Sequence, residues 1–352
     1  MNIALTYNQK PDSDNSATEA PSSDESLPPL ASGNYNDTYA EWDSIETIEA
    51  VRAALAENHN VEMIEANEEA FDKLRRSRPA IVFNIAEGMN GLSREAQMPA
   101  MLDMLKIPYT GSDPLTLAIC LDKSRAKEIL TYYNIKTARF ATSDKINMNG
   151  GMNLNFPLFV KPVGEGSSKG IFNSSVVKNK KELAEIIEHN NANYSQPSLI
   201  EEFLPGREFT VAVMGNGSEA EALPIIEIIY DGLPKEMNKI YSYEAKWILD
   251  RPENPLDIFQ CPAKVDAVLE RKIKETALAA YNILKCRDWS RIDVRLDAEG
   301  EPNIIEVNPL PGILPDPKDN SCFPKAARTA GLNYSRMLNK VLDIAIKRYG
   351  LA

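Results

Sequence analysis

The feature that most restricts this chain is a pair of stretches near its C-terminal end, Arg291–Leu296 and Asn303–Val307, in which polar and apolar residues alternate on either side of a short turn. Residues two apart share a face of a β-strand, so the alternation predicts two adjacent strands, each with one apolar and one polar face. The polar faces gather Asp293, Glu306 and Asn308, whose side chains offer the hard oxygen ligands that Mg²⁺ prefers beside nucleotide phosphates. A hairpin with a solvated polar face is the alternative interpretation.

A second candidate site is a loop rich in glycine and serine, residues 164–170, which follows the predicted strand Phe159-Val160-Lys161. Backbone N–H groups of such a loop can surround phosphate oxygens, and a lysine on the preceding strand adds a positive charge. The loop is not a Walker A motif, because it lacks the GK[ST] ending and no helix follows it directly. A simple hairpin connection is the alternative.

A third candidate is the segment Leu199–Glu208, in which the chain leaves one predicted strand, turns at Pro205-Gly206 and enters another. The edge of an extended segment can form hydrogen bonds with an adenine base, and a carboxylate can accept hydrogen bonds from ribose hydroxyls. Taken alone, the same pattern also describes a surface hairpin with solvated glutamates.

The first third of the chain has the rhythm of a parallel sheet. Strands are expected at residues 2–7, 61–64 and 80–84, with a helix before each of the last two. This alternation favours a βαβαβ arrangement. The first of these helices is expected to begin at Asp43, because Asp43 and Glu46 have capping-box spacing.

The stretch from residue 9 to about residue 36 has a different composition. It is rich in Asp, Ser, Pro and Ala and contains few apolar residues. Such a segment cannot bury enough apolar surface to offset the entropy lost on ordering, so we expect a mobile insertion.

Length, charge and cysteine usage exclude several classes of protein. The 352 residues are enough for two or three subdomains. The 51 acidic and 39 basic residues give a net charge of −12, which opposes general binding of nucleic acid. No apolar run approaches the roughly 18 residues that span a bilayer, and no secretory signal is visible. The 4 cysteines lack CxxC spacing and fit reduced thiols, so we expect a cytoplasmic protein without a membrane or nucleic-acid partner.

Taken together and in order, these pieces resemble the ATP-grasp fold and, within it, the D-alanine–D-alanine ligase family, from about Phe83 to the C-terminus. The resemblance implies a mixed α/β (α+β) fold in three parts. These are an N-terminal parallel-sheet domain (1–121), a central small nucleotide-binding subdomain (122–205) and a C-terminal catalytic subdomain (206–352). The motifs that carry the resemblance are Pro108–Ser112 with Asp122-Lys123, Lys161–Ser168, Tyr243–Lys246, Arg291–Val294, Glu306-x-Asn308 with Pro311-Gly312, and Ser321–Pro324.

The resemblance also implies roles for individual residues. The ATP-binding residues would be Lys123, Lys161, Ser168, Glu201, Glu202, Leu204 and Glu208. Two Mg²⁺ ions, for which Mn²⁺ is an alternative, would be bound by Asp293, Glu306 and Asn308. The oxyanion site would consist of Arg291 and Gly312, with Ser167 and Lys246 as further catalytic residues. The substrates would be contacted by Glu87, Trp247, Ser321 and Cys322.

The activity implied by the resemblance is an ATP-dependent joining of a carboxylate to an amine. The carboxylate takes the γ-phosphoryl group of ATP to become an acyl phosphate, and the amine then displaces phosphate. Positioned cations lower the barriers of both steps. The substrates would be an amino acid or another small carboxylate and an amine, and dimers are common in the family, so the first third is the expected interface of a homodimer.

The departures from the family pattern cluster at the pocket for the first substrate. The family carries a GGxSxE segment near the N-terminus, whose glutamate helps to hold the ammonium group of the first amino acid. That motif is absent here. An ungapped match to HGxxGEDGxxQ places Glu87 at the histidine and Leu92 at the glutamate of this motif, and Trp247 replaces a tyrosine. We therefore expect a pocket bordered by Glu87, Leu92 and Trp247, anchored by Ser167, that prefers a bulkier or cationic substrate to D-alanine. Arg94 would undo the effect by neutralising Glu87.

Three functions remain open at this point. The first is a ligase that makes the D-alanine dipeptide, or a close D-amino-acid product, for peptidoglycan synthesis. The second is a related ligase that couples another amino acid or amine in a specialised pathway. The third is a nucleotide-binding regulator that has lost catalysis, and the presence of Arg291, both lysines and all three metal ligands argues against it.

Overall fold

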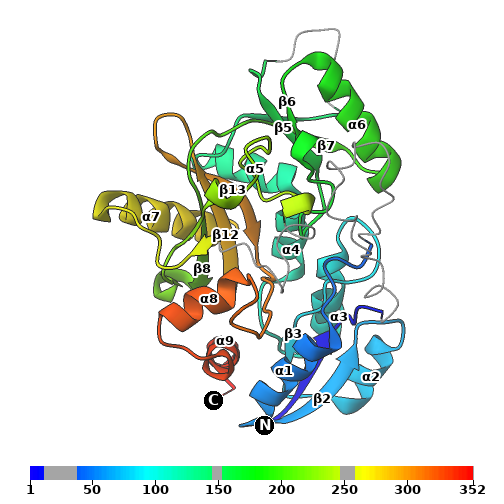
Figure 1. Cartoon of the computed structure of the whole chain (residues 1–352). Helices are drawn as coiled ribbons and strands as arrows, with labels where there is room; N and C mark the ends of the chain where they lie inside the picture. Colours follow the sequence, from blue (N-terminus) through cyan, green and yellow to red (C-terminus); the bar gives the residue numbers. More distant parts are fainter. Residues whose placement is uncertain (12–37, 145–152, 246–257, 352) are drawn as a thin grey trace, which may run out of the picture.

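The computed structural model describes residues 1–11, 38–144, 153–245 and 258–351 (Figure 1). Most of the predicted mobile insertion, together with Lys246 and Trp247, lies outside these residues. The start of the predicted insertion lies beside the segment that leads into the first helix. Gln9 forms a parallel β-bridge with Asp43, and the Lys10 N–H donates to the Asp43 carbonyl at 2.8 Å.

The N-terminal part contains the parallel sheet that the sequence predicts. Its strand order is β2 (Asn60–Glu65), β1 (Asn2–Tyr7) and β3 (Ile81–Asn84), and both pairings are parallel. The intervening helices are α1 (Ile45–Ala56) and α2 (Ala70–Ser77). Buried aliphatic and aromatic side chains of β1 and β3 pack against α1, which explains the βαβαβ rhythm.

The start of α1 differs from the expectation. The N-cap is Ser44, whose hydroxyl accepts from the Thr47 N–H at 3.4 Å, so Asp43 is not the cap. Serine is as good a cap as aspartate, and the helix begins one residue later than the capping-box spacing suggests. The Asp43 carboxyl is thereby left to line a cavity.

Three helices follow the first sheet: α3 (Gln97–Leu105), α4 (Pro114–Leu121) and α5 (Lys123–Tyr132). Helix α4 was not predicted from the sequence. Its signal was present, since Asp113 caps the helix by accepting from the Thr116 N–H at 2.9 Å and Pro114 occupies the first turn.

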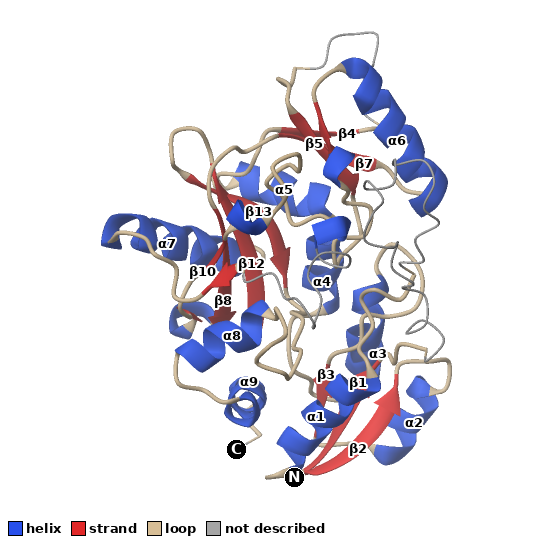
Figure 2. Cartoon of the chain, in the orientation of Figure 1, coloured by secondary structure: helices blue, strands red, loops and turns tan. Residues whose placement is uncertain are grey.

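The central part is a four-stranded sheet with one long helix on it. The strand order is β4 (Phe140–Thr142), β7 (Ser198–Glu202), β5 (Leu158–Pro162) and β6 (Val176–Val177), and all pairings are antiparallel. Helix α6 (Lys180–Tyr194) packs on this sheet through a small apolar core (Figure 2). The turn between β5 and β6 holds the Gly-rich loop.

The C-terminal part is built on an antiparallel sheet of order β11-β10-β8-β12-β13, with β9 paired to β8. Its strands are β8 (Glu208–Met214), β9 (Glu221–Ala222), β10 (Ile226–Ile228), β11 (Phe259–Gln260), β12 (Trp289–Leu296) and β13 (Pro302–Asn308). The helices of this part are α7 (Ala267–Ile283), α8 (Cys322–Thr329) and α9 (Tyr334–Tyr349).

The two faces of β8 explain where an open site can form. Phe209, Val211 and Val213 pack against α7 in one apolar core. On the other face Ala212 and Met214 pack with α8 and α9, in a core that also includes β1, β3 and α1 of the N-terminal part. The remaining residues of that face, Glu208 and Thr210, line a cavity instead. The N-terminal and C-terminal sheets therefore share a core. The two chain termini lie near each other in Figure 1.

None of the helices in the described ranges is both long enough and apolar enough to cross a lipid bilayer. The boundaries expected between the three parts of the chain, after residues 121 and 205, stay predictions.

Candidate active site

A cavity of about 360 Å³ lies where the three parts of the chain meet. It is lined by β5, β7, β8, β12 and β13, by the Gly-rich loop, by residues 40–44 and by residues 310–314. The cavity collects nearly all of the described candidate residues. These are Glu87, Lys161, Ser167, Ser168, Glu201, Glu202, Leu204, Glu208, Arg291, Asp293, Glu306, Asn308, Gly312, Ser321 and Cys322.

The acidic face of β12 and β13 is arranged as the alternation predicts. The register places Asp293 opposite Glu306 and Arg291 opposite Asn308. An Arg291 guanidinium nitrogen (Nη2) lies 3.0 Å from Asp293 Oδ2. With its amide turned so that oxygen accepts from Arg291 at 2.8 Å, Asn308 donates to Glu306 Oε1 at 3.3 Å. The neighbouring Ile292 is fully buried on the opposite face.

Lys123, at the start of α5, forms an ion pair with this acidic face of β12 and β13. Its Nζ lies 3.0 Å from Glu306 Oε1, and the lysine is only 3% exposed. Burial opposes the charge of Glu306, but Lys123, Lys161 and Arg291 outweigh burial and lower the pKa of Glu306. Glu306 is therefore ionised at neutral pH, which is the form a metal ion or a phosphate-bound cation requires.

A buried cluster of three charges lies beside the cavity. Glu201 Oε1 is 2.6 Å from Lys127 Nζ, and its Oε2 is 3.0 Å from Lys161 Nζ. Burial opposes ionisation of Glu201, yet the two lysines lower its pKa to about 2. Glu201 thus fixes the position of Lys161, the predicted phosphate-binding lysine. Lys127 was not predicted as part of the site, because only its position on the buried face of α5 distinguishes it in the sequence.

Glu202 and Glu208 have different surroundings. The Glu202 carboxylate accepts from Arg139 at 2.9 Å near the surface, which leaves its backbone at the cavity. Glu208 accepts from Tyr230 at 2.9 Å and from Arg295 at 2.7 Å. Burial raises the pKa of Glu208 despite the nearby guanidinium.

The Gly-rich loop folds back over the cavity. Ser167 and Ser168 both have positive φ angles, 49° and 62°, a left-handed backbone that residues other than glycine rarely adopt. The Ser168 hydroxyl donates to the Tyr241 carbonyl at 3.1 Å. Lys123 Nζ donates to the Glu165 carbonyl at 2.5 Å and so joins the loop to the acidic face.

The far wall is formed by the Pro-rich loop and the start of α8. A Cβ atom added to Gly312 would meet nothing within 4 Å, so its backbone faces open space in the cavity. The Ser321 hydroxyl donates to the Gly312 carbonyl at 3.2 Å and accepts from the Leu314 N–H at 3.1 Å. Ser321 therefore holds the shape of this loop, and Cys322 lines the cavity next to it.

The pocket expected for the first substrate differs from the prediction in two ways. Leu92 is 74% exposed and does not border the cavity, because the chain around it turns outward before Arg94. Acidic residues that the sequence analysis missed take part instead, namely Glu41, Asp43 and Glu95. Glu41 follows the 12–37 stretch, where no periodic pattern marks it.

The charge of this acidic group is not fixed. Burial raises the pKa of Asp43 to about 7. Burial, with Glu41 and other neighbours, raises the pKa of Glu95 to about 8 and that of Glu87 well above its usual range. Burial therefore favours the neutral form of Glu87, and a cation bound beside it would favour the ionised form. Arg94 does not neutralise it by contact, since the Arg94 guanidinium is bound to Glu41.

The sequence profile described as "D-ala D-ala ligase C-terminus" matches residues 127–343, which is more than half of the chain. The chain belongs to the D-alanine–D-alanine ligase family. The matched range includes Lys161, Glu201, Arg291 and Glu306 of the cavity. Membership makes it an ATP-dependent ligase that forms an amide bond.

Relatives of this D-alanine–D-alanine ligase family member match most of its length. The D-alanine–D-alanine ligase of Glaesserella parasuis serovar 5 (strain SH0165) is 35% identical over 295 residues, which are 82% of this chain and 88% of the relative. The uncharacterized protein y4sG of Sinorhizobium fredii (strain NBRC 101917 / NGR234) is 32% identical over 319 residues, 88% of this chain and 90% of the relative.

A solved structure has the same fold. The crystal structure of D-alanine–D-alanine ligase from Bacillus anthracis complexed with ATP superposes with a TM-score of 0.71 at 23% sequence identity, covering 100% of this chain and 99% of that one. The similarity confirms the predicted ATP-grasp fold with a parallel sheet at the N-terminus.

Proposed function

We propose that this family member joins the carboxylate of one amino acid to the amine of a second substrate through an acyl phosphate, releasing ADP and phosphate. The observation that carries the proposal is one cavity with Lys161 and the Gly-rich loop on one side and Arg291, Asp293, Glu306 and Asn308 on the other. Cations and anion-binding N–H groups facing a carboxylate pair are the equipment for phosphoryl transfer. The ATP complex of the Bacillus anthracis ligase supports ATP as the nucleotide.

Lys161 and Ser168 would hold the phosphates, and β7 with its following loop would hold the base. Glu201, Glu202 and Leu204 line that end of the cavity. Glu208 lies where its carboxylate can accept hydrogen bonds from the ribose hydroxyls. Lys123 would act indirectly, by holding the Gly-rich loop through the Glu165 carbonyl.

Arg291 and the Gly312 N–H would stabilise the oxyanion that forms when the amine attacks. Arg291 keeps an unpaired buried Nε–H in addition to its ion pair with Asp293. A single preorganised donor of this kind typically contributes about 10²–10³ in rate. Ser321, beside Gly312, would contact the second substrate with Cys322.

Magnesium would be held by Asp293, Glu306 and Asn308. The fit rests on the donor set, since two carboxylates and an amide from adjacent strands offer oxygen atoms at one end of the cavity. The metal would neutralise phosphate charge during transfer. Mg²⁺, or Mn²⁺ in its place, is thus part of the proposal. The roles of Lys246 and Trp247, which lie outside the described residues, are part of it as well.

For the first substrate we propose an amino acid that is larger than D-alanine or carries an additional cation. Asp43, Glu87 and Glu95 border that end of the cavity, and their carboxyl groups form no hydrogen bond or ion pair with another described side chain. A second cationic group would pair with these carboxyls, which the methyl group of D-alanine cannot do. Synthesis of the D-alanine dipeptide remains the alternative.

A coupled ADP-release assay over a panel of D- and L-amino acids, alone and in pairs, tests the proposal. We expect release that requires ATP, Mg²⁺ and two amino substrates, with kcat/KM higher for a cationic or bulky first substrate than for D-alanine. If D-alanine with D-alanine is the best pair, with a millimolar or lower KM, the dipeptide assignment holds and the pocket argument is wrong. Nucleotide binding without any release would favour the regulator.

A further inference from the structure

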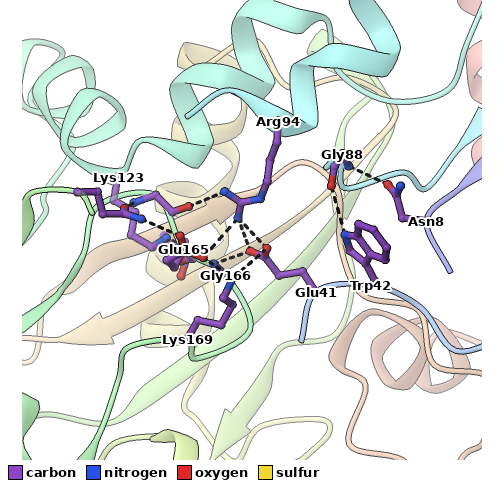
Figure 3. Close-up of polar contacts among 12 residues, drawn as sticks. Asn8, Glu41, Trp42, Gly88, Arg94, Lys123, Glu165, Gly166 and Lys169 are labelled. Atoms are coloured by element: carbon purple, nitrogen blue, oxygen red, sulfur yellow. Dashed lines mark hydrogen bonds and ion pairs between the residues drawn. The ribbon is translucent and has the colours of Figure 1, made fainter. Parts of the chain in front are cut away.

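An ion pair between Arg94 and Glu41 lies at the edge of the Gly-rich loop (Figure 3). Arg94 Nη2 lies 2.5 Å from Glu41 Oε1 and 2.7 Å from its Oε2. The side chains are only 11% and 8% exposed. Charges this well buried are retained only with close partners, because either one alone would stay desolvated.

The same pair binds the loop backbone with both of its charges. Glu41 Oε1 accepts from the Gly166 N–H at 2.7 Å, and Arg94 Nη1 donates to the Gly164 carbonyl at 2.9 Å. A Cβ atom at Gly166 would lie 2.6 Å from Glu41 Oε1, so a larger residue at this position would displace the carboxylate. One N–H and one C=O, two residues apart, are thus held by groups from the N-terminal part of the chain.

The loop is held from the opposite side as well. Lys123 Nζ binds the Glu165 carbonyl and also pairs with Glu306 on β13. The Glu165 carboxylate pairs with Lys169 at 2.7 Å and accepts from Gln196 at 2.7 Å. The loop therefore lies between the acidic face of the cavity and the Arg94–Glu41 pair, and Figure 3 shows both sets of contacts converging on it.

We propose that Arg94 is a positioning residue for the ligase reaction, which through Glu41 and Gly164 holds the Gly-rich loop closed over the acyl phosphate. The inference rests on the proposed function. The closed loop excludes water from the intermediate. When it opens, water attacks the acyl carbon in place of the amine, the carboxylate is regenerated and phosphate leaves, so ATP is hydrolysed without an amide bond.

The test measures ADP and amide product together, using the best substrate pair of the panel. In the unmodified protein we expect one amide bond per ADP. Arg94→Met and Glu41→Gln should lower this ratio clearly below one and reduce kcat/KM by about 10²-fold, the typical effect of misplacing a reacting group by about 1 Å. Arg94→Lys should fall between, because lysine keeps the charge but cannot reach two acceptors in a fixed fork.

The matched control is Arg52→Met, which removes an exposed arginine from an ion pair with Glu49 on α1. It should leave both readouts unchanged. The ratio is counted per turnover, so poor folding of a variant lowers the signal but not the ratio. An unchanged ratio and unchanged kinetic constants in both Arg94 variants would overturn the inference. Absence of ADP release by the unmodified protein would instead refute the proposed function.

Discussion

Glu306 lies where burial and positive charge act in opposite directions on one carboxylate. Burial favours its protonated form, and Lys123, Lys161 and Arg291 favour the ionised form strongly enough to lower its pKa. Lys161 and Arg291 also pair with Glu201 and Asp293, so cations and carboxylates alternate along the cavity wall. Such a wall suits the triphosphate of a nucleotide, and the carboxylate then supplies a ligand for the accompanying divalent metal.

Replacing Glu306 by glutamine tests that role. The amide keeps the size of the side chain but removes the charge, so we expect turnover to fall by about 10²-fold or more with little change in Tm. The measurement is ADP release as a function of Mg²⁺ concentration. Glu299→Gln, in the exposed turn between β12 and β13, is the control. Near-normal turnover of Glu306→Gln at limiting Mg²⁺ would exclude the metal assignment.

Asp43 provides a prediction about stability. Its pKa is raised by burial from an ordinary value of 3.8 to about 7, so between these values the unfolded chain loses the proton and the folded chain keeps it. Stability is therefore lost as pH rises from about 4 to about 7. Each unit of difference corresponds to about 1.4 kcal/mol, and partial exposure reduces the sum to the order of 1–2 kcal/mol.

We accordingly expect Asp43→Asn to raise Tm at pH 8 and to leave it almost unchanged at pH 4. Thermal melts at the two pH values measure this directly. Asp231→Asn, at a highly exposed side chain, should change Tm at neither pH. If the Tm of Asp43→Asn at pH 8 is lower than the Tm of the unmodified protein, the Asp43 carboxyl is ionised in the folded protein and stabilised by its surroundings.

At the level of elements, local patterns predicted the strands that carry the chemistry. The alternation at β12 and β13 predicted that Asp293, Glu306 and Asn308 lie together. The exact pairing was not predicted, because a register shift between Asp293 and Val294 sets Asp293 opposite Glu306. The parallel N-terminal sheet also followed from its rhythm. Helix α4 was missed although Asp113 and Pro114 signal its start.

Contacts between distant segments could not be predicted. Glu41 meets Gly166 across 125 positions, and no local pattern connects them. The ungapped alignment placed Leu92 in the pocket, whereas the chain there turns outward and brings Arg94 to Glu41. Sequence reasoning thus identified the strands of the site and missed the residues that join its parts.

The cluster of Lys127, Lys161 and Glu201 joins α5 to the central sheet. Lys127→Met would leave Glu201 with Lys161 as its remaining ion partner among the described residues. Removing one member of a buried ion cluster typically costs about 3–5 kcal/mol. We expect that loss in urea unfolding, together with a higher KM for ATP because Lys161 is less firmly held.

Lys178→Met, at an exposed position before α6, is the control and should change stability by less than about 0.5 kcal/mol. If Lys127→Met lost less than about 1 kcal/mol and kept its KM for ATP, the cluster would have no part in positioning Lys161.

At the scale of the whole molecule, the cavity exists because three sheets meet around it. The N-terminal and C-terminal parts share one apolar core, and Arg348 on α9 pairs with the buried Asp288 at 2.7 Å while donating to the Tyr109 carbonyl at 2.8 Å. These two parts are therefore packed directly against each other. The central sheet has its own small core, and the Gly-rich loop that it carries lies over the other two parts.

Such an architecture suits a reaction with an intermediate that water must not reach. The nucleotide end is built on β5 and β7, the acidic face on β12 and β13, and the first-substrate end on residues 40–44 with Glu87. A homodimer through the first third stays a prediction, which the mass of the protein in solution would test.

Transfer of ¹⁸O from the carboxylate of the first substrate to phosphate tests the central claim most directly. With both carboxylate oxygens of the best first substrate labelled, an acyl-phosphate route places one ¹⁸O in the released phosphate for each amide bond formed. We predict this label in phosphate, with ADP as the nucleotide product. Unlabelled phosphate accompanying amide formation, or label found in AMP, would contradict the account.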